Sequence, residues 1–183
     1  MPFMTAVLAA ASVAVVPWAG PPSHGVSVEE QFAPARAGAG GAVTYDLGAV
    51  PEGSRVKVVE RTDARGTRIE LRVSGVEAGR GFGAHVHQKP CGADPEASGP
   101  HYQHRVDPVQ PSVDPAYANP RNEAWLDFTT DGRGQGASGT RVAWHFRAGG
   151  AYSVVVHEHL TETGPGHAGM AGERLACVNV PFR

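Results

Sequence analysis

Short stretches of alternating apolar and polar residues, separated by turn-forming residues, run through the chain from residue 42 onward. The alternation is cleanest at Ile69, Leu71 and Val73, and a period of two residues is typical of a strand with one buried face. No segment shows a convincing helical period. We therefore predict eight strands, at 42–46, 55–60, 67–73, 81–88, 124–130, 140–146, 151–157 and 174–180.

The spacing of these strands predicts an all-β fold, an antiparallel sandwich or barrel, within a single domain. The chain has 183 residues, of which 24 are Gly and 15 are Pro, and this composition suits a β protein rich in loops. Its formal net charge of -2 does not indicate a nucleic acid or a membrane surface as a partner.

One connection is much longer than the others. Residues 89–121 are rich in proline and lack periodicity, and a loop of this length inside a compact domain is usually functional or tied down. Cys91 and His101 both lie within this loop.

The N-terminal segment indicates export. Residues 6–16 form an apolar run with the length of the hydrophobic region of a signal peptide, too short to span a bilayer, although no Lys or Arg precedes it. A buried strand or helix is the weaker interpretation, because Pro17, Gly20 and Pro21 follow directly. We expect a signal peptide at 1–20, a disordered linker rich in Pro, Gly and Ala at 21–41, and the folded domain at 42–183.

Cys91 and Cys177 are the only cysteines of the chain. An even number of cysteines in an exported chain favours a disulfide bond. Closing such a long loop is worth roughly 4–5 kcal/mol through its effect on the entropy of the unfolded chain. The alternative is a pair of buried free thiols.

His85 and His87 flank a single residue of a predicted strand, so their side chains point to the same face of the sheet. Two neighbouring imidazoles form half of a metal site. His101 lies in the long loop, and His157 ends an apolar run. Four histidines at strand ends and on a tethered loop indicate a metal site, and imidazole is a common ligand of copper and zinc.

In order and approximate separation, these residues resemble the motifs of the copper/zinc superoxide dismutase family. The matching pieces are Gly81-Phe-x-x-His85-Val-His87, Cys91, Ser98-Gly-Pro-His101-Tyr, Val-Val-Val-His157-Glu and Gly172-Glu-Arg174-Leu-Ala-Cys177. The resemblance implies an eight-stranded antiparallel Greek-key β-barrel or sandwich with long metal-binding loops. It also implies that His85, His87, His101 and His157 bind copper, with His101 as the histidine that bridges copper to zinc in the family.

The resemblance assigns further roles to three residues outside the copper ligands. Cys91 and Cys177 would form the disulfide bond that pins the long loop to the last strand. Arg174 would attract superoxide and position it beside the copper, because a guanidinium raises the local concentration of a small anion and orients it. Arg174 and His101 are therefore the expected catalytic residues.

The zinc site of the family has no counterpart in this sequence. The three positions of its non-bridging ligands hold residues that are not ligand types: Val109, Asn122 and Trp125. The chain therefore resembles a copper-only, bacterial-type variant of the family. The alternative is a zinc site improvised from His104, Asp107 and Asp114.

The leading hypothesis is an exported copper-dependent superoxide dismutase, which converts superoxide to oxygen and hydrogen peroxide. Without zinc, protons would come from water or from a neighbour such as Glu158 or His159. The alternative is a copper-binding or copper-buffering protein on the same fold with little turnover, but a storage site has no need of Arg174 as an anion guide. A relative without metal is disfavoured because all four histidines are retained.

Overall fold

The computed structural model describes residues 24–36 and 40–183, which form two main β-sheets and a two-stranded ribbon. One sheet has the order β1-β4-β5-β9, with strands His24–Gln31, Arg55–Asp63, Gly66–Ser74 and Gln135–Val142. The other has the order β2-β3-β11-β10-β7, with strands Ala33–Pro34, Ala42–Thr44, Arg174–Asn179, Ser153–His157 and Ala84–His87. The ribbon consists of β6 (Gly81–Phe82) and β8 (Phe128–Thr129). All pairings are antiparallel except that of β2 with β3.

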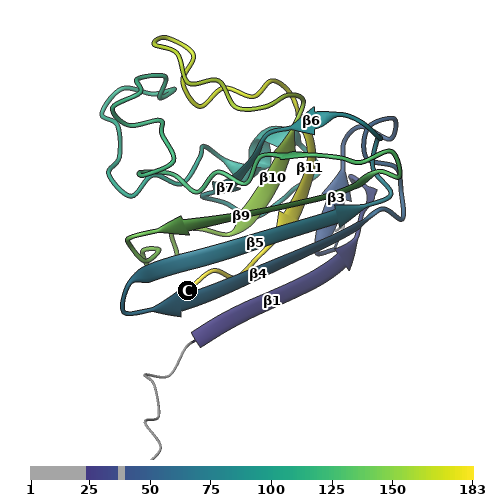
Figure 1. The fold of residues 1–183 in the computed structure, drawn as a ribbon, viewed down its shortest axis with the longest axis horizontal. Coiled ribbons are helices and arrows are strands. Elements are labelled where there is room, and N and C mark those ends of the chain that lie inside the picture. Colours follow the sequence, from purple (N-terminus) through teal and green to yellow (C-terminus); the bar gives the residue numbers. More distant parts are fainter. Residues whose placement is uncertain (1–23, 37–39) are drawn as a thin grey trace, which may run out of the picture.

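The two sheets lie face to face and enclose the core, so the fold is an all-β sandwich (Figure 1). In β5, the predicted alternation is confirmed, because Ile69, Leu71 and Val73 are buried between exposed or half-buried polar residues. The facing sheet contributes Val86 and Val154 to the same core. Burying an aliphatic side chain of this size stabilises a fold by about 1.5–3 kcal/mol, and this burial holds the sheets together.

Helical structure is almost absent from the described residues, as predicted. Their only helical element is the 3-10 helix η1 (Pro95–Ser98), which lies in the long loop. No helix in residues 24–36 or 40–183 has the length and apolar character needed to cross a membrane.

The second sheet is buried on both of its faces. In β10, Val154 and Val156 point into the core between the sheets. Val155 points the other way and packs with Val43 and Cys177 in a smaller cluster. This outer face is therefore shielded from solvent as well, and the side chains that alternate with the core positions of β7 and β10 lie on it.

The long loop is tied to this sheet. A disulfide bond between Cys91 and Cys177 joins the start of the loop to β11, which is the pairing that the resemblance implied. An isolated β-bridge then pairs His101 with β7. Figure 1 shows the loop above the sheets, next to the loop that joins β10 to β11.

β1 corrects the expected linker at 21–41. His24–Gln31 form an edge strand that pairs with β4 along its whole length, and β2 follows at Ala33–Pro34. The strand was not apparent in the sequence because an edge strand needs few apolar side chains, and Ser27, Glu29 and Gln31 are exposed. The ordered domain therefore begins before residue 42, whereas the predicted signal peptide at 1–20 lies outside the described residues.

Two predicted strands also differ from those of the structure. β9 spans Gln135–Val142 rather than 140–146, because β5 pairs with residues of low strand propensity such as Gly136 and Gly139. Of the strand predicted at 124–130, only Phe128 and Thr129 form β8, and Trp125 makes an isolated bridge.

Candidate metal centre

Four histidines from three parts of the chain meet on the outer face of the second sheet. His85 and His87 come from β7, His157 ends β10, and His101 follows η1 in the long loop. One ring nitrogen of each lies within 4.8 Å of those of the other three. Among the described residues they are the only group of three or more potential metal ligands. The structure therefore brings together all four residues that the sequence indicated.

The pairing of β7 with β10 sets the spacing of three of these rings. Val155 pairs with His85, and Ser153 pairs with His87, so the outer-face positions of the two strands are aligned. His157 comes two residues after Val155, so it continues the same face beyond the last of these pairs.

His87 and His157 each donate one ring N–H to a backbone carbonyl. Nδ1 of His87 donates to Gly99 O at 2.8 Å, and Nδ1 of His157 donates to Gly172 O at 3.3 Å. Because a carbonyl oxygen only accepts, each neutral ring carries its proton on Nδ1 and a lone pair on Nε2. The two Nε2 atoms face each other at 3.3 Å. A cation held between them would relieve the repulsion of these lone pairs.

His85 is oriented by a chain of two hydrogen bonds. The Thr161 hydroxyl donates to Asp127 Oδ1 at 2.7 Å, so it accepts from His85 Nε2 at 2.6 Å. Nδ1 of His85 then has the lone pair, and this buried atom has no hydrogen-bond partner. Buried polar atoms rarely lack a partner, so the orphaned nitrogen indicates that a ligand belongs beside it.

His101 is held by a carboxylate that is itself buried. Nδ1 of His101 donates to Glu123 Oε2 at 2.9 Å. Trp125 Nε1 donates to the same oxygen at 2.7 Å, and Gln103 Nε2 donates to Oε1 at 2.8 Å. Glu123 is 1% exposed, and these three donors satisfy it. Nε2 of His101 is left to face the other three rings.

The four nitrogens with free lone pairs are therefore Nδ1 of His85 and Nε2 of the other three histidines. Histidines that bind metals commonly donate their second N–H to a carboxylate, a carbonyl or a hydroxyl, as all four rings do here. The donor set fits copper or zinc, both of which accept neutral imidazole.

The electrostatics of the cluster favour neutral rings. Burial lowers the pKa of His85 and His87 well below its usual value, and charge on His101 and His157 would lower it further. The pKa of His157 falls to about 3, mainly through burial and then through His101. Near neutral pH these three rings are therefore in the form that binds a metal ion.

Arg174 lies beside the cluster at a cavity of about 450 Å³ that His101 and His157 also line. Nη1 of Arg174 donates to Pro95 O at 3.1 Å and to Ser98 Oγ at 2.7 Å. The positive charge of Arg174 contributes to the low pKa of His157, in keeping with a short separation.

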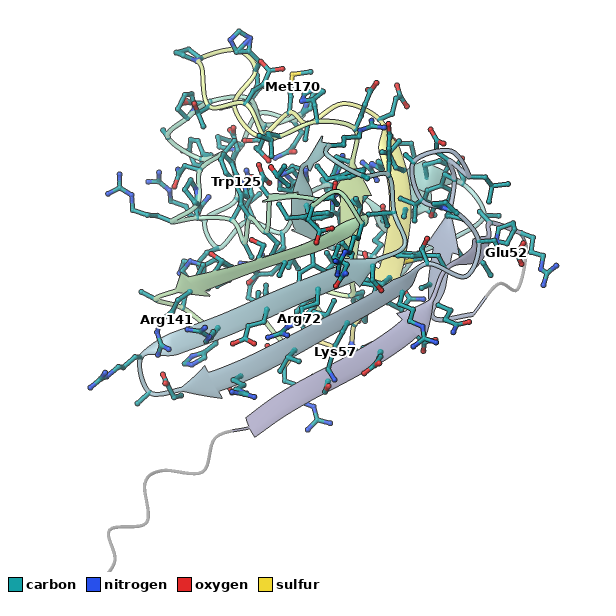
Figure 2. All side chains as sticks on the ribbon, turned by 45° about the vertical axis from the view of Figure 1, so that its right-hand side comes forward. Glu52, Lys57, Arg72, Trp125, Arg141 and Met170 are labelled. Atoms are coloured by element: carbon teal, nitrogen blue, oxygen red, sulfur yellow. A yellow bond between two sulfur atoms is a disulfide. The ribbon has the colours of Figure 1, made fainter. Side chains whose placement is uncertain are left out.

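Loop residues form the rest of this cavity. Met170 lines it and is half exposed, and Figure 2 shows Met170 and Trp125 among the loops above the sheets. The cavity is open to solvent and is lined by loop residues and by the ends of β10 and β11, whereas Lys57 and Arg72 lie on β4 and β5 (Figure 2). A small solute thus has a route to the histidines.

The three positions where the sequence lacks the zinc ligands of the family have other contacts. Val109 is exposed. Asn122 braces the loop, because its amide group donates to Arg105 O and accepts from the Arg105 backbone N–H. Trp125 donates to Glu123.

The residues considered for an improvised zinc site are likewise engaged elsewhere. His104 stacks on Trp144 with ring centroids 5.2 Å apart. Asp107 accepts from Ser112 Oγ at 2.7 Å, and Asp114 accepts from a backbone N–H at 2.8 Å. Within the described residues these three do not form a ligand group.

The two candidate proton donors, Glu158 and His159, are exposed and lie outside the histidine cluster. Nδ1 of His159 donates to Leu160 O at 2.9 Å. Glu158 accepts from the backbone N–H of Glu173.

Sequence reasoning missed three residues that orient the rings: Glu123, Thr161 and Asp127. Glu123 could have been found, because it lies between Asn122 and Trp125, the positions searched for zinc ligands. Thr161 is 76 residues from His85 and carried no local signal.

Comparison with known proteins shows the fold. No protein-family model matches the chain, and no curated protein matches it either. Among solved structures, a double mutant of a SOD-like protein from Bacillus subtilis is similar with a TM-score of 0.55 and 16% identity, over 78% of this chain and 95% of that one. The Cu/Zn superoxide dismutase from Brucella abortus is similar with a TM-score of 0.53 and 19% identity, over 87% and 99% of the two chains. At these identities the likeness establishes a shared fold.

Proposed function

We propose that this chain is an exported copper-dependent superoxide dismutase, which converts superoxide to oxygen and hydrogen peroxide. The observation that carries the proposal is the convergence of four ring nitrogens with free lone pairs beside the Arg174 guanidinium, at an open cavity. The likeness of the fold to the Brucella Cu/Zn superoxide dismutase supports it.

His85, His87, His101 and His157 would hold the copper. Bound there, copper would supply the one-electron chemistry, because it moves between two oxidation states that an all-imidazole set accommodates. Arg174 would draw superoxide into the cavity and orient it, since its Nη1 is already fixed by Pro95 and Ser98.

Glu123 supports a site that works with copper alone. In the family that the sequence resembles, the bridging histidine connects copper to zinc. Here the Nδ1–H of His101 donates to the Glu123 carboxylate, which keeps Nε2 turned toward the cluster. We therefore propose that the protein functions without zinc.

Water is the proton source that best fits this arrangement. The cavity is open to solvent beside His101 and His157. Glu158 and His159 are also solvent-exposed, and they do not belong to the ligand group.

A copper-buffering protein with little turnover is the second candidate. One observation favours it: the Arg174 guanidinium forms a 2.9 Å salt bridge with Glu96, which partly neutralises the charge that would guide superoxide. The two candidates differ in whether Arg174 affects a rate.

Replacing Arg174 tests the choice. In copper-loaded protein of equal copper content, we expect Arg174→Ala to slow superoxide consumption by about tenfold, in line with local electrostatic steering. Arg174→Lys should have an intermediate rate, because the charge remains while the planar fork is lost. Equally low rates for wild type and Arg174→Ala, with copper content and thermal stability matched, would favour the buffering protein.

Export is part of the proposal. The Cys91–Cys177 disulfide supports it, because disulfide bonds persist in oxidising compartments. N-terminal sequencing of the protein from its native cells tests it: we expect a start near residue 20, and an intact N-terminus in the cytoplasm would contradict it.

A further inference from the structure

We propose that Glu96 lowers the affinity of this site for small anions, because its carboxylate competes with an incoming anion for the Arg174 guanidinium. This inference rests on the proposed function insofar as it takes the cavity to receive a small anion. The inference adds to the site a carboxylate of the protein itself that competes with the anion for Arg174, which the histidines and Arg174 alone would not imply.

The donors of Arg174 are divided between fixed and releasable partners. Nη1 contacts Pro95 O and Ser98 Oγ, two neutral acceptors of η1, and these account for both of its hydrogens. Nη2 contacts the carboxylate of Glu96 at 2.9 Å. With Nη1 engaged, an anion that binds this guanidinium in a bidentate manner uses Nε–H and Nη2–H, and Glu96 contacts Nη2, so the two compete for that nitrogen.

Exposure shows which partner is able to move. The side chain of Arg174 is only 15% exposed, whereas that of Glu96 is 74% exposed. A salt bridge with one partner in solvent is weak, so Glu96 competes with an anion without excluding it.

The backbone of Glu96 is fixed close to the cavity. Asp94 caps η1 by accepting from the Glu96 backbone N–H at 2.8 Å. The preceding Cys91 is anchored to β11 by the disulfide bond. Displacement of the carboxylate therefore requires only a rotation of the Glu96 side chain, because the main chain around it is tied at both points.

The entrance consequently carries less positive charge than Arg174 alone would give it. Glu96 and Glu173 both line the cavity with Arg174, so the three side chains together have a net negative formal charge. Glu173 has no contact with the guanidinium among the described hydrogen bonds and salt bridges, so it contributes charge without occupying Nη2. This difference makes Glu173 the matched control.

Azide binding to the copper-loaded protein provides the first test. Glu96→Gln removes the charge and weakens the hold on Nη2, so we expect the azide Kd from an absorption titration to fall by about two- to fivefold, the range of an exposed salt bridge. Glu173→Gln should lower the azide Kd by less than half of the change seen in Glu96→Gln. An unchanged Kd in Glu96→Gln, or equal changes in the two variants, would overturn the inference.

The metal-free protein provides a second test that does not involve copper. Phenylglyoxal modifies free guanidinium groups, and mass spectrometry locates the product. Arg174 should be modified faster in Glu96→Gln than in either wild type or Glu173→Gln. Equal rates in all three proteins would overturn the inference.

These measurements separate the inference from the proposed function. If wild type binds copper without consuming superoxide, while Glu96→Gln still binds azide more tightly, the dismutase proposal fails and the role of Glu96 stands. If wild type consumes superoxide and Glu96→Gln shows no change in azide Kd, the dismutase proposal stands and the role of Glu96 fails.

Discussion

Nδ1 of His101 lies 2.9 Å from Oε2 of Glu123, and the carboxylate that holds this ring is itself buried. The contact sets the tautomer of His101 and turns its Nε2 toward the other three histidines. In the proposed copper-only site, this buried carboxylate would take the place of the support that a second metal ion gives.

Glu123→Gln should therefore weaken copper binding. The carboxylate accepts from three donors, whereas an amide offers one accepting oxygen and adds N–H donors of its own, so at least one donor would face another. Losing a hydrogen bond that orients a ligand typically costs about 10- to 100-fold in metal affinity, and we expect a loss in this range.

A competition titration of copper with a chelator measures this loss. Glu162→Gln is the control, because Glu162 is an exposed carboxylate of the loop after β10 and has no contact with the four clustered histidines among the described interactions. Equal copper affinities for Glu123→Gln and Glu162→Gln would contradict the role of Glu123.

Thr161 should matter through its hydroxyl group alone. Thr161→Val keeps the shape of the side chain but removes the acceptor of His85 Nε2–H and the donor to Asp127. We expect copper affinity to fall by about tenfold or more, and Thr161→Ser to restore most of it. If the serine and valine variants bind copper equally, the hydrogen-bond chain does not orient His85.

Loss of the disulfide bond should affect stability and copper retention together. The bond joins the loop that carries His101 to the strand that begins with Arg174. Cys177→Ser should lower the free energy of unfolding by about 2–5 kcal/mol and speed copper release to a chelator. Free thiols in the native mature protein, detected by titration, would show that the bond is not formed.

Glu60 should give the protein a distinct pH dependence. Burial raises the pKa of Glu60 to about 6 from 4.5, against the lowering effects of the Arg183 backbone N–H and of charge on Arg183 and His145. Because the pKa of Glu60 is higher in the folded protein than in the unfolded chain, binding of a proton to Glu60 favours the folded state. This contribution to the free energy of unfolding is complete below about pH 4.5 and is lost as the pH rises through 6. The loss amounts to about 2 kcal/mol.

Urea unfolding of the metal-free protein at several pH values measures this effect. As the pH rises from 4.5 to 7.5, the free energy of unfolding of wild type should fall relative to that of Glu60→Gln. Glu52→Gln, at an exposed position, should show no such trend. Parallel pH profiles for Glu60→Gln and wild type would contradict the raised pKa.

The sequence predicted those features that a local period determines. The alternation at Ile69 and Leu71 identified β5, and the single-residue spacing of His85 and His87 placed both rings on one face. β1 remained hidden because an edge strand leaves little apolar pattern, so its place was decided by its pairing with β4.

The ring supports depended on contacts between distant segments. Thr161 and Asp127 are far from His85 in the sequence, and no local sequence pattern indicates a contact of this kind. The salt bridge of Arg174 with Glu96 likewise depends on how the long loop folds against β11.

The most direct test of the account is the metal content of the protein together with its superoxide consumption. The protein is loaded with copper alone, freed of excess metal and assayed before and after incubation with zinc. We predict one copper per chain, substoichiometric zinc, and catalytic consumption of superoxide that zinc does not increase. One tightly bound zinc per chain, or copper-loaded protein without catalytic consumption of superoxide, would contradict a dismutase that works with copper alone.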